Sequence, residues 1–105
     1  MAAGIQVNIP EEAIVQFCQR WKIVEFALFG SVLRTDFREE SDIDVLVTFE
    51  PAAPWSLFDF VQMQDELEAI FGRKVDLIER AGLRNPYRLE SILDSMRVIY
   101  DAVGT

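Results

Sequence analysis

Three short apolar runs, separated by segments with helical periodicity, constrain the fold of this chain more than any other feature. The runs are Ile23–Phe29, Ile43–Phe49 and Lys74–Glu79, and each has the length of one β-strand. The first two are rich in β-branched and aromatic residues, which is typical of buried strands, whereas the third alternates apolar and charged residues at Val75-Asp76-Leu77. The first ends at Gly30, and Arg97–Tyr100 adds a fourth short run. The chain is therefore expected to build a small sheet.

The segment before the first strand predicts an amphipathic helix from Ile9 to Trp21, with Pro10 at the first helical position. Apolar residues recur there at helical spacing and define one buried stripe. The stripe consists of Ile14, Phe17, Cys18 and Trp21. Cys18 is expected to be a small core residue rather than a reactive thiol.

Two further helices are predicted between and after the other strands. Ser56 and Asp59 resemble a capping pair for a helix that ends at Phe71, before Gly72. The expected core positions of this helix are Leu57, Phe60, Val61, Leu67 and Ile70. Its acidic residues Asp65, Glu66 and Glu68 are expected on a solvated face. Asn85 and Pro86 open the last helix, which runs to about Asp94.

This order of elements predicts the fold class. Strand, short helical turn, strand, helix, strand, helix and strand favour an α/β (α+β) fold with one mixed β-sheet and helices packed against it. A length of 105 residues fits one compact domain, residues 1–105.

Composition excludes several classes of function. The formal net charge is −8, from 18 acidic and 10 basic residues, so a long nucleic acid is not expected as the main ligand. The absence of histidine excludes His-ligated zinc and His-dependent triads, and a single cysteine excludes an internal disulfide. No apolar run approaches the roughly 20 residues that span a bilayer, and no signal peptide opens the chain. We expect a cytoplasmic protein that does not contact membranes.

Three aspartates in the predicted strands are candidate metal ligands. Asp42 and Asp44 are two residues apart, so on a strand they project from one face. Asp76 lies in the third strand, between Val75 and Leu77, and reaches the same patch if the two strands are neighbours. Two like charges about 6 Å apart repel by roughly 3 kcal/mol at an effective dielectric constant near 20, and bound Mg²⁺ ions would remove this cost. A lone Asp-x-Asp pair on a surface is more often only solvated.

Gly30 and Ser31 form a candidate phosphate-binding turn, because they follow a buried strand and precede a short helical turn through Arg34. Glycine lets the backbone approach a phosphate closely, while free amides and the serine hydroxyl can bind an anion. Two basic residues of the following loop, Arg34 and Arg38, could touch a nucleotide or pair in solvent with the neighbouring glutamates 39 and 40.

The spacing of these residues resembles the polymerase-β-like nucleotidyltransferase superfamily, in particular its minimal branch. The resemblance rests on Gly30-Ser31, a ten-residue gap, Asp42-x-Asp44 in an apolar strand and Asp76 in a later one, and it extends to Tyr100. It implies that the Gly-Ser turn holds the triphosphate of ATP, that the first two aspartates bind two Mg²⁺ ions, and that Asp76 completes the site and can act as the general base.

The same resemblance implies a role beside a partner protein. Minimal nucleotidyltransferases are commonly antitoxins of a HEPN-domain ribonuclease, and some transfer AMP to a tyrosine of that toxin. Two alternatives stay open: a non-catalytic module that neutralises its partner by occlusion, and an enzyme that modifies small aminoglycoside-like compounds. Two positions depart from the common family pattern, Leu33 and Thr35, and bear on the shape of the loop beside Arg34.

The aromatic residues around the proline turn at 51–54 have two readings. Trp55, Phe58 and Phe60 could stack on a nucleotide base, although core packing or contact with a partner protein is favoured for them.

Overall fold

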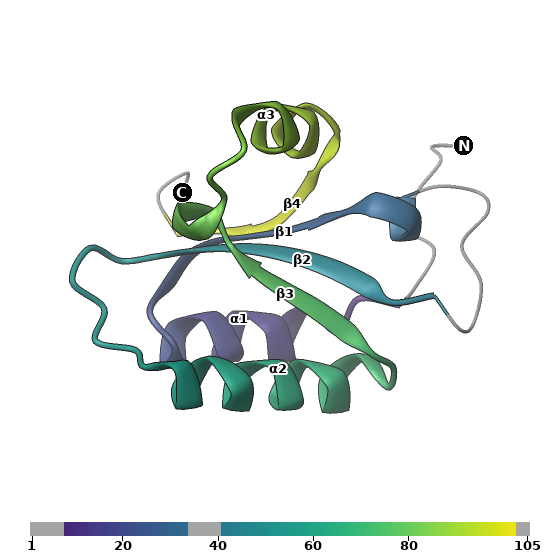
Figure 1. Ribbon diagram of the computed structural model, residues 1–105. Helices are drawn as coiled ribbons and strands as arrows, with labels where there is room; N and C mark the ends of the chain where they lie inside the picture. Colours follow the sequence, from purple (N-terminus) through teal and green to yellow (C-terminus); the bar gives the residue numbers. More distant parts are fainter. Residues whose placement is uncertain (1–7, 34–40, 103–105) are drawn as a thin grey trace.

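A computed structural model describes residues 8–33 and 41–102, which form one four-stranded mixed sheet with helices on both faces (Figure 1). The strands are β1 (Ile23–Phe29), β2 (Ile43–Phe49), β3 (Val75–Glu79) and β4 (Arg97–Asp101), in the order β3-β2-β1-β4. The sheet is antiparallel at β1–β2 and β1–β4 and parallel at β2–β3. The helices are α1 (Glu11–Arg20), α2 (Leu57–Phe71) and α3 (Pro86–Ser95), with short 3₁₀ turns η1 (Gly30–Leu33) and η2 (Arg80–Gly82). The predicted fold class is confirmed.

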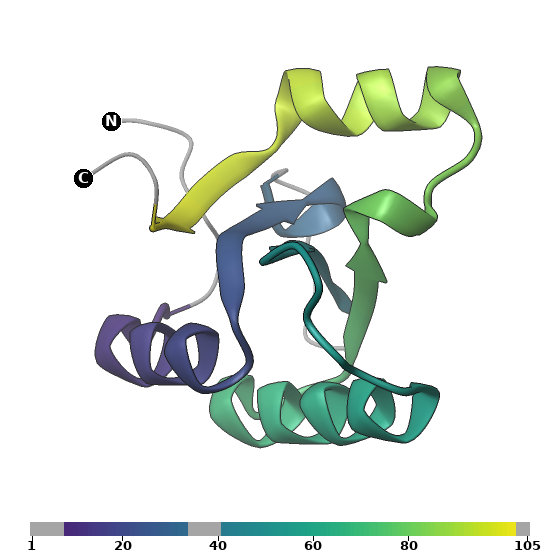
Figure 2. The ribbon, with the colours of Figure 1, turned by 90° about the vertical axis from the view of Figure 1, so that its left-hand side faces the viewer.

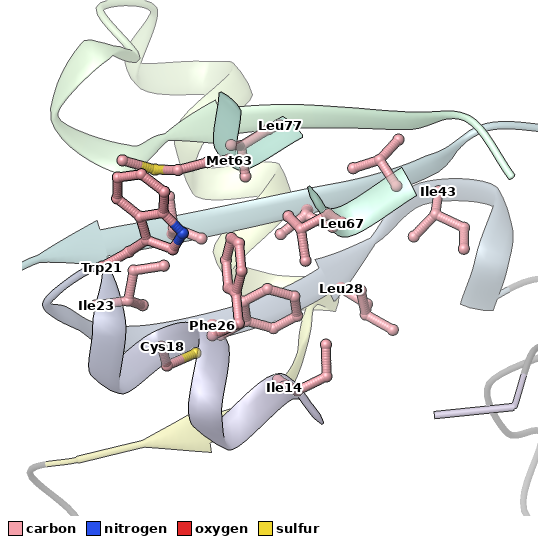
Figure 3. Close-up of a cluster of buried hydrophobic side chains, with 14 of the residues drawn as sticks. Ile14, Cys18, Trp21, Ile23, Phe26, Leu28, Ile43, Met63, Leu67 and Leu77 are labelled. Atoms are coloured by element: carbon pink, nitrogen blue, oxygen red, sulfur yellow. The ribbon is translucent and has the colours of Figure 1, made fainter. Parts of the chain in front are cut away.

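The two faces of the sheet carry different apolar layers. Helices α1 and α2 lie side by side beneath the sheet, and α3 lies above it (Figures 1 and 2). The larger core lies between the sheet and the first two helices, and Figure 3 shows Phe26, Met63 and Leu67 in it. A smaller cluster of Phe29, Leu46 and Ile92 forms beneath α3.

Helix α1 forms as its apolar periodicity predicts. All four residues of the predicted stripe are buried: Ile14, Phe17, Cys18 and Trp21. Burial raises the pKa of the Cys18 thiol to about 12, and this cysteine is a core residue. The predicted start is wrong by one position, because Pro10 is the N-cap and the first helical residue is Glu11.

Helix α2 begins and ends as predicted, but its buried face differs. The Ser56–Asp59 capping box is present, and Gly72 ends the helix with a left-handed φ of 72°. The predicted core positions Leu57 and Val61 are wrong, since they are 79% and 55% exposed. The sheet instead buries Met63 and Leu67, with two partly buried residues, Phe60 and Ile70. These four recur every three or four residues, and Leu57 and Val61 lie beside that stripe.

Two acidic residues of α2 are not simply solvated, which corrects the prediction for this face. Glu66 accepts hydrogen bonds from Arg20 and from Trp21 Nε1, the latter at 3.0 Å, and Glu68 Oε2 accepts one from the backbone N–H of Val75 at 3.2 Å. Burial opposes the charge of Glu66, but the hydrogen bonds from Trp21 and Arg20 outweigh it and lower its pKa. These carboxylates therefore tie α2 to α1 and to β3.

Within residues 8–33 and 41–102, none of the helices combines the length and apolar character that crossing a bilayer requires.

Candidate active site

The central feature of the site is a pair of aspartates on neighbouring parallel strands. Asp44 of β2 and Asp76 of β3 are Cα partners in the ladder. Partners in a parallel ladder project from the same face, so both side chains lie on the face opposite α1 and α2. Asp44 is half-buried and Asp76 is exposed. Two residues far apart in the sequence are thus held side by side.

This pairing follows from the connection between the two strands. Helix α2 carries the chain from the end of β2 back to the start of β3, and such a crossover makes the strands parallel. The Ile43 N–H donates to the Lys74 carbonyl at 2.9 Å, which fixes the register at the first residues. The second residue of each strand is an aspartate, so both aspartates lie at the same end of the sheet.

Gly30 packs directly against one carboxylate of this pair. Its neighbour Phe29 is the ladder partner of Asp44, and Gly30 then turns away with a left-handed φ of 77°. A Cβ atom at this position would overlap Asp44 Oδ2 and lie 3.2 Å from its Cγ. Glycine is required here by the backbone conformation and by the closeness of the carboxylate. The sequence indicated a glycine turn but not this contact.

Ser31 follows Gly30 in η1, and its side chain is half-buried. Val32 is fully buried and anchors the turn in the core, against which Leu33 also packs. The sequence predictions for Arg34, Thr35 and Arg38 fall outside the described residues.

Asp42 lies one residue before β2 and is exposed. Among the residues that the structure describes, no three acidic, Cys or His side chains lie close enough to hold a metal ion together. The ladder therefore pairs Asp44 with Asp76, whereas a joint site of these two residues with Asp42 stays a prediction. Carboxylate oxygens are the ligands that Mg²⁺ prefers, so the donor set and the register of the pair fit this ion.

The same sheet face is apolar on one side of the pair. Leu46 and Ile78, each two residues after an aspartate, are ladder partners and belong to the cluster beneath α3. A water-poor wall beside carboxylates strengthens their electrostatic interactions with cations and phosphates. The arrangement fits a site for a charged ligand at the end of the sheet.

Comparison with known proteins identifies the class to which this fold and site belong. Residues 11–99 match the family model described as nucleotidyltransferase domain. The chain is a member of the nucleotidyltransferase domain family.

Two relatives of this chain are described as protein adenylyltransferases. The candidate protein adenylyltransferase MJ1379 of Methanocaldococcus jannaschii is 39% identical over 77 residues, which cover 73% of this chain and 77% of that protein. The protein adenylyltransferase MntA of Thermococcus cleftensis is 37% identical over 67 residues, which cover 64% of this chain and 66% of the relative.

Solved structures agree with this placement. A structure described as a candidate minimal nucleotidyltransferase is 36% identical, with a TM-score of 0.69 over 83% of this chain and 86% of that one. The fold is also shared with a complex of a tri-AMPylated Shewanella oneidensis HEPN toxin and its MNT antitoxin, at 18% identity and a TM-score of 0.64 over 87% and 69% of the two chains. This chain is a nucleotidyltransferase of the minimal type.

Proposed function

We propose that this single domain, residues 1–105, transfers AMP from ATP to a hydroxyl group of a partner protein in a magnesium-dependent reaction. We further propose that the partner is a HEPN ribonuclease toxin, which the domain neutralises as its antitoxin. We also propose that this ATP-consuming activity lies in the cytoplasm.

The observation that carries the proposal is the pairing of Asp44 with Asp76 beside Gly30. The ladder brings the two carboxylates to one face, and Gly30 holds the β1–η1 turn against Asp44. A nucleotide whose triphosphate lies along this turn would place its α-phosphate near both aspartates. Asp42 and Asp44 would hold the metal ions, Gly30 and Ser31 would bind the triphosphate, and Arg34 is proposed as a further phosphate contact.

The chemical step needs one base and one leaving group. Asp76 accepts the proton of the acceptor hydroxyl while the hydroxyl oxygen forms a bond to the α-phosphorus of ATP. The bond from that phosphorus to the bridging oxygen breaks, and pyrophosphate leaves. When bound, Mg²⁺ would neutralise negative charge on the phosphates. Asp76 is exposed, which leaves it accessible to a hydroxyl that belongs to a separate protein.

The nature of the acceptor is supported by the names of the relatives and by the charge of the chain. Two relatives are described as protein adenylyltransferases, and a chain of similar fold is the antitoxin of a HEPN toxin that carries AMP groups. A net charge of −8 favours association with a basic protein and disfavours a long nucleic acid.

The test is transfer of label from α-labelled ATP to the HEPN-domain protein in the presence of Mg²⁺. We expect label on the partner with wild type and a loss of at least about 100-fold in rate with Asp44→Asn or Asp76→Asn. A Glu12→Gln variant is the control, because this exposed carboxylate lies on α1, beneath the sheet, and should leave the rate unchanged.

Two results would contradict the proposal. Label that persists in the Asp44→Asn and Asp76→Asn variants would exclude these residues from the reaction. A tight complex without any transfer of label would favour neutralisation by occlusion instead.

A further inference from the structure

An apolar surface of α2 is exposed at the opposite end of the sheet from the candidate active site. Leu57, Phe58 and Val61 are 79%, 88% and 55% exposed, and they occupy the first two turns of the helix. In Figure 1 the β2–α2 connection that leads to them lies at the left, whereas the η1 turn lies at the right. Clustered apolar side chains at this exposure mark an interaction site more often than scattered single ones.

A cavity of about 630 Å³ borders this surface. Its wall combines aromatic side chains with two carboxylates, and none of its lining residues is basic. The residues that matter here are Phe49, Glu50, Trp55, Phe60 and Glu79. A carboxylate beside aromatic rings suits the side chain of arginine or lysine, because the cation can pair with the acid and stack on a ring.

Two neighbouring features also favour an arginine or lysine side chain in this cavity. Thr48 also lines the cavity, and its buried hydroxyl makes no hydrogen bond within the part of the chain that the structure describes. Arg80 follows Glu79 in sequence but lies 3.7 Å from Glu25 in an ion pair. A guanidinium or ammonium group from outside could satisfy both the hydroxyl and the cavity carboxylates.

The charge of the surface argues against a second copy of this chain as the occupant. Asp65 lies one turn after Val61 on the same side of α2, so the exposed apolar residues continue into a carboxylate. A symmetric pairing would bring Asp65 and the cavity acids of two chains together, each with a net charge of −8. A positively charged partner would be attracted to this surface, whereas a second copy of the chain would be repelled.

We propose that Leu57, Phe58 and Val61, together with the cavity, form the docking surface for the partner protein. The docking segment would place apolar side chains on α2 and insert an arginine or lysine between Glu50 and Glu79. This inference rests on the proposed function, because the partner is the protein that accepts AMP. Thr48 is four residues after Asp44, roughly 13 Å along β2, so a partner held here can extend a neighbouring segment to the active site.

The experiment measures binding of the HEPN-domain protein by calorimetry to wild type and to three variants. Phe58→Ser removes the most exposed apolar side chain, and Glu50→Gln/Glu79→Gln removes the cavity charge without changing its shape. Tyr87→Ser is the matched control, because Tyr87 is an aromatic residue of α3 that is 82% exposed. Thermal unfolding confirms that each variant is folded.

We expect the first two changes to raise Kd at least tenfold, and the control to stay within about twofold of wild type. Added salt should weaken partner binding by wild type more than binding by the Glu50→Gln/Glu79→Gln variant. Transfer of AMP by Phe58→Ser should show a raised KM for the partner and an unchanged kcat, whereas Asp44→Asn should bind normally and transfer nothing.

The outcomes separate the two proposals. Wild-type affinity in the Phe58→Ser and Glu50→Gln/Glu79→Gln variants overturns the docking surface and leaves the transferase proposal intact. Weaker binding by these variants, together with no transfer of AMP by wild type, supports the docking surface and overturns the transferase proposal. A dimer of this chain that Phe58→Ser dissociates overturns the assignment to a different partner, and absence of any binding by wild type overturns both.

Discussion

The contact between Gly30 and Asp44 yields the sharpest prediction, because the structure supplies both the change and its control. A Cβ atom at position 30 would stand about 1.2 Å inside the 3.4 Å at which ordinary van der Waals contact with Asp44 Oδ2 begins. The Gly30→Ala variant must therefore move the carboxylate or the turn by about 1 Å. A displacement of this size in a catalytic site can cost about 100-fold in rate.

The backbone contributes a second, separable cost. A residue other than glycine in the left-handed region loses about 1–2 kcal/mol, and Gly30 has a φ of 77°. Gly72 has nearly the same φ, 72°, with no atom within 4 Å of an added Cβ. Gly72→Ala thus reproduces the backbone strain without touching a carboxylate.

The assay compares kcat/KM for transfer of AMP with the free energy of unfolding for both variants. We expect each to lose about 1–2 kcal/mol of stability through the backbone alone, and only Gly30→Ala to lose about 100-fold in kcat/KM. Full activity in Gly30→Ala, or an equal loss in Gly72→Ala, would refute the reasoning.

Three further predictions concern stability. Met63→Ala should cost about 2–5 kcal/mol in a denaturant titration, whereas Val61→Ala should cost less than about 0.5 kcal/mol, since only Met63 is buried. Ser56→Ala should cost about 1 kcal/mol in the same titration, because the Ser56 side chain caps the backbone N–H of Asp59. The thiol of Cys18 should react with a maleimide only after unfolding. Since its pKa is raised from 9.0 to about 12 by burial, it contributes stability that is complete below pH 9 and is lost as the pH rises from 9 towards 12.

The strands and most helix ends could be predicted from the sequence because their signals are local. Short apolar runs defined β1 and β2 to the residue, and the Ser56 cap and Gly72 stop defined α2. The buried face of α2 could not be predicted in this way. Apolar residues surround much of its first two turns, so periodicity alone does not distinguish the side facing the sheet from the exposed side.

The candidate site was also predictable only where its signals are local. The residue types and their spacing indicated carboxylate chemistry and a glycine turn. The pairing of Asp44 with Asp76 depends on a parallel register that α2 sets across the 31 residues between them, and the packing of Gly30 against Asp44 depends on an antiparallel register. Both are tertiary consequences that no local pattern contains.

The pairing of two carboxylates also predicts that the site lowers the folding stability of the metal-free protein. Like charges at directly opposed ladder positions are destabilising, and exposure of Asp76 should keep the cost below the roughly 3 kcal/mol expected at an effective dielectric constant near 20. Asp76→Asn should therefore raise the unfolding temperature in chelator while it removes transfer of AMP. Wild type should gain more stability from added Mg²⁺ than this variant does, because binding to the folded state alone is stabilising. Equal gains in the two proteins would show that the Asp44–Asp76 pair is not where the cation binds. A loss of stability in the variant without Mg²⁺ would contradict the repulsion between the two carboxylates.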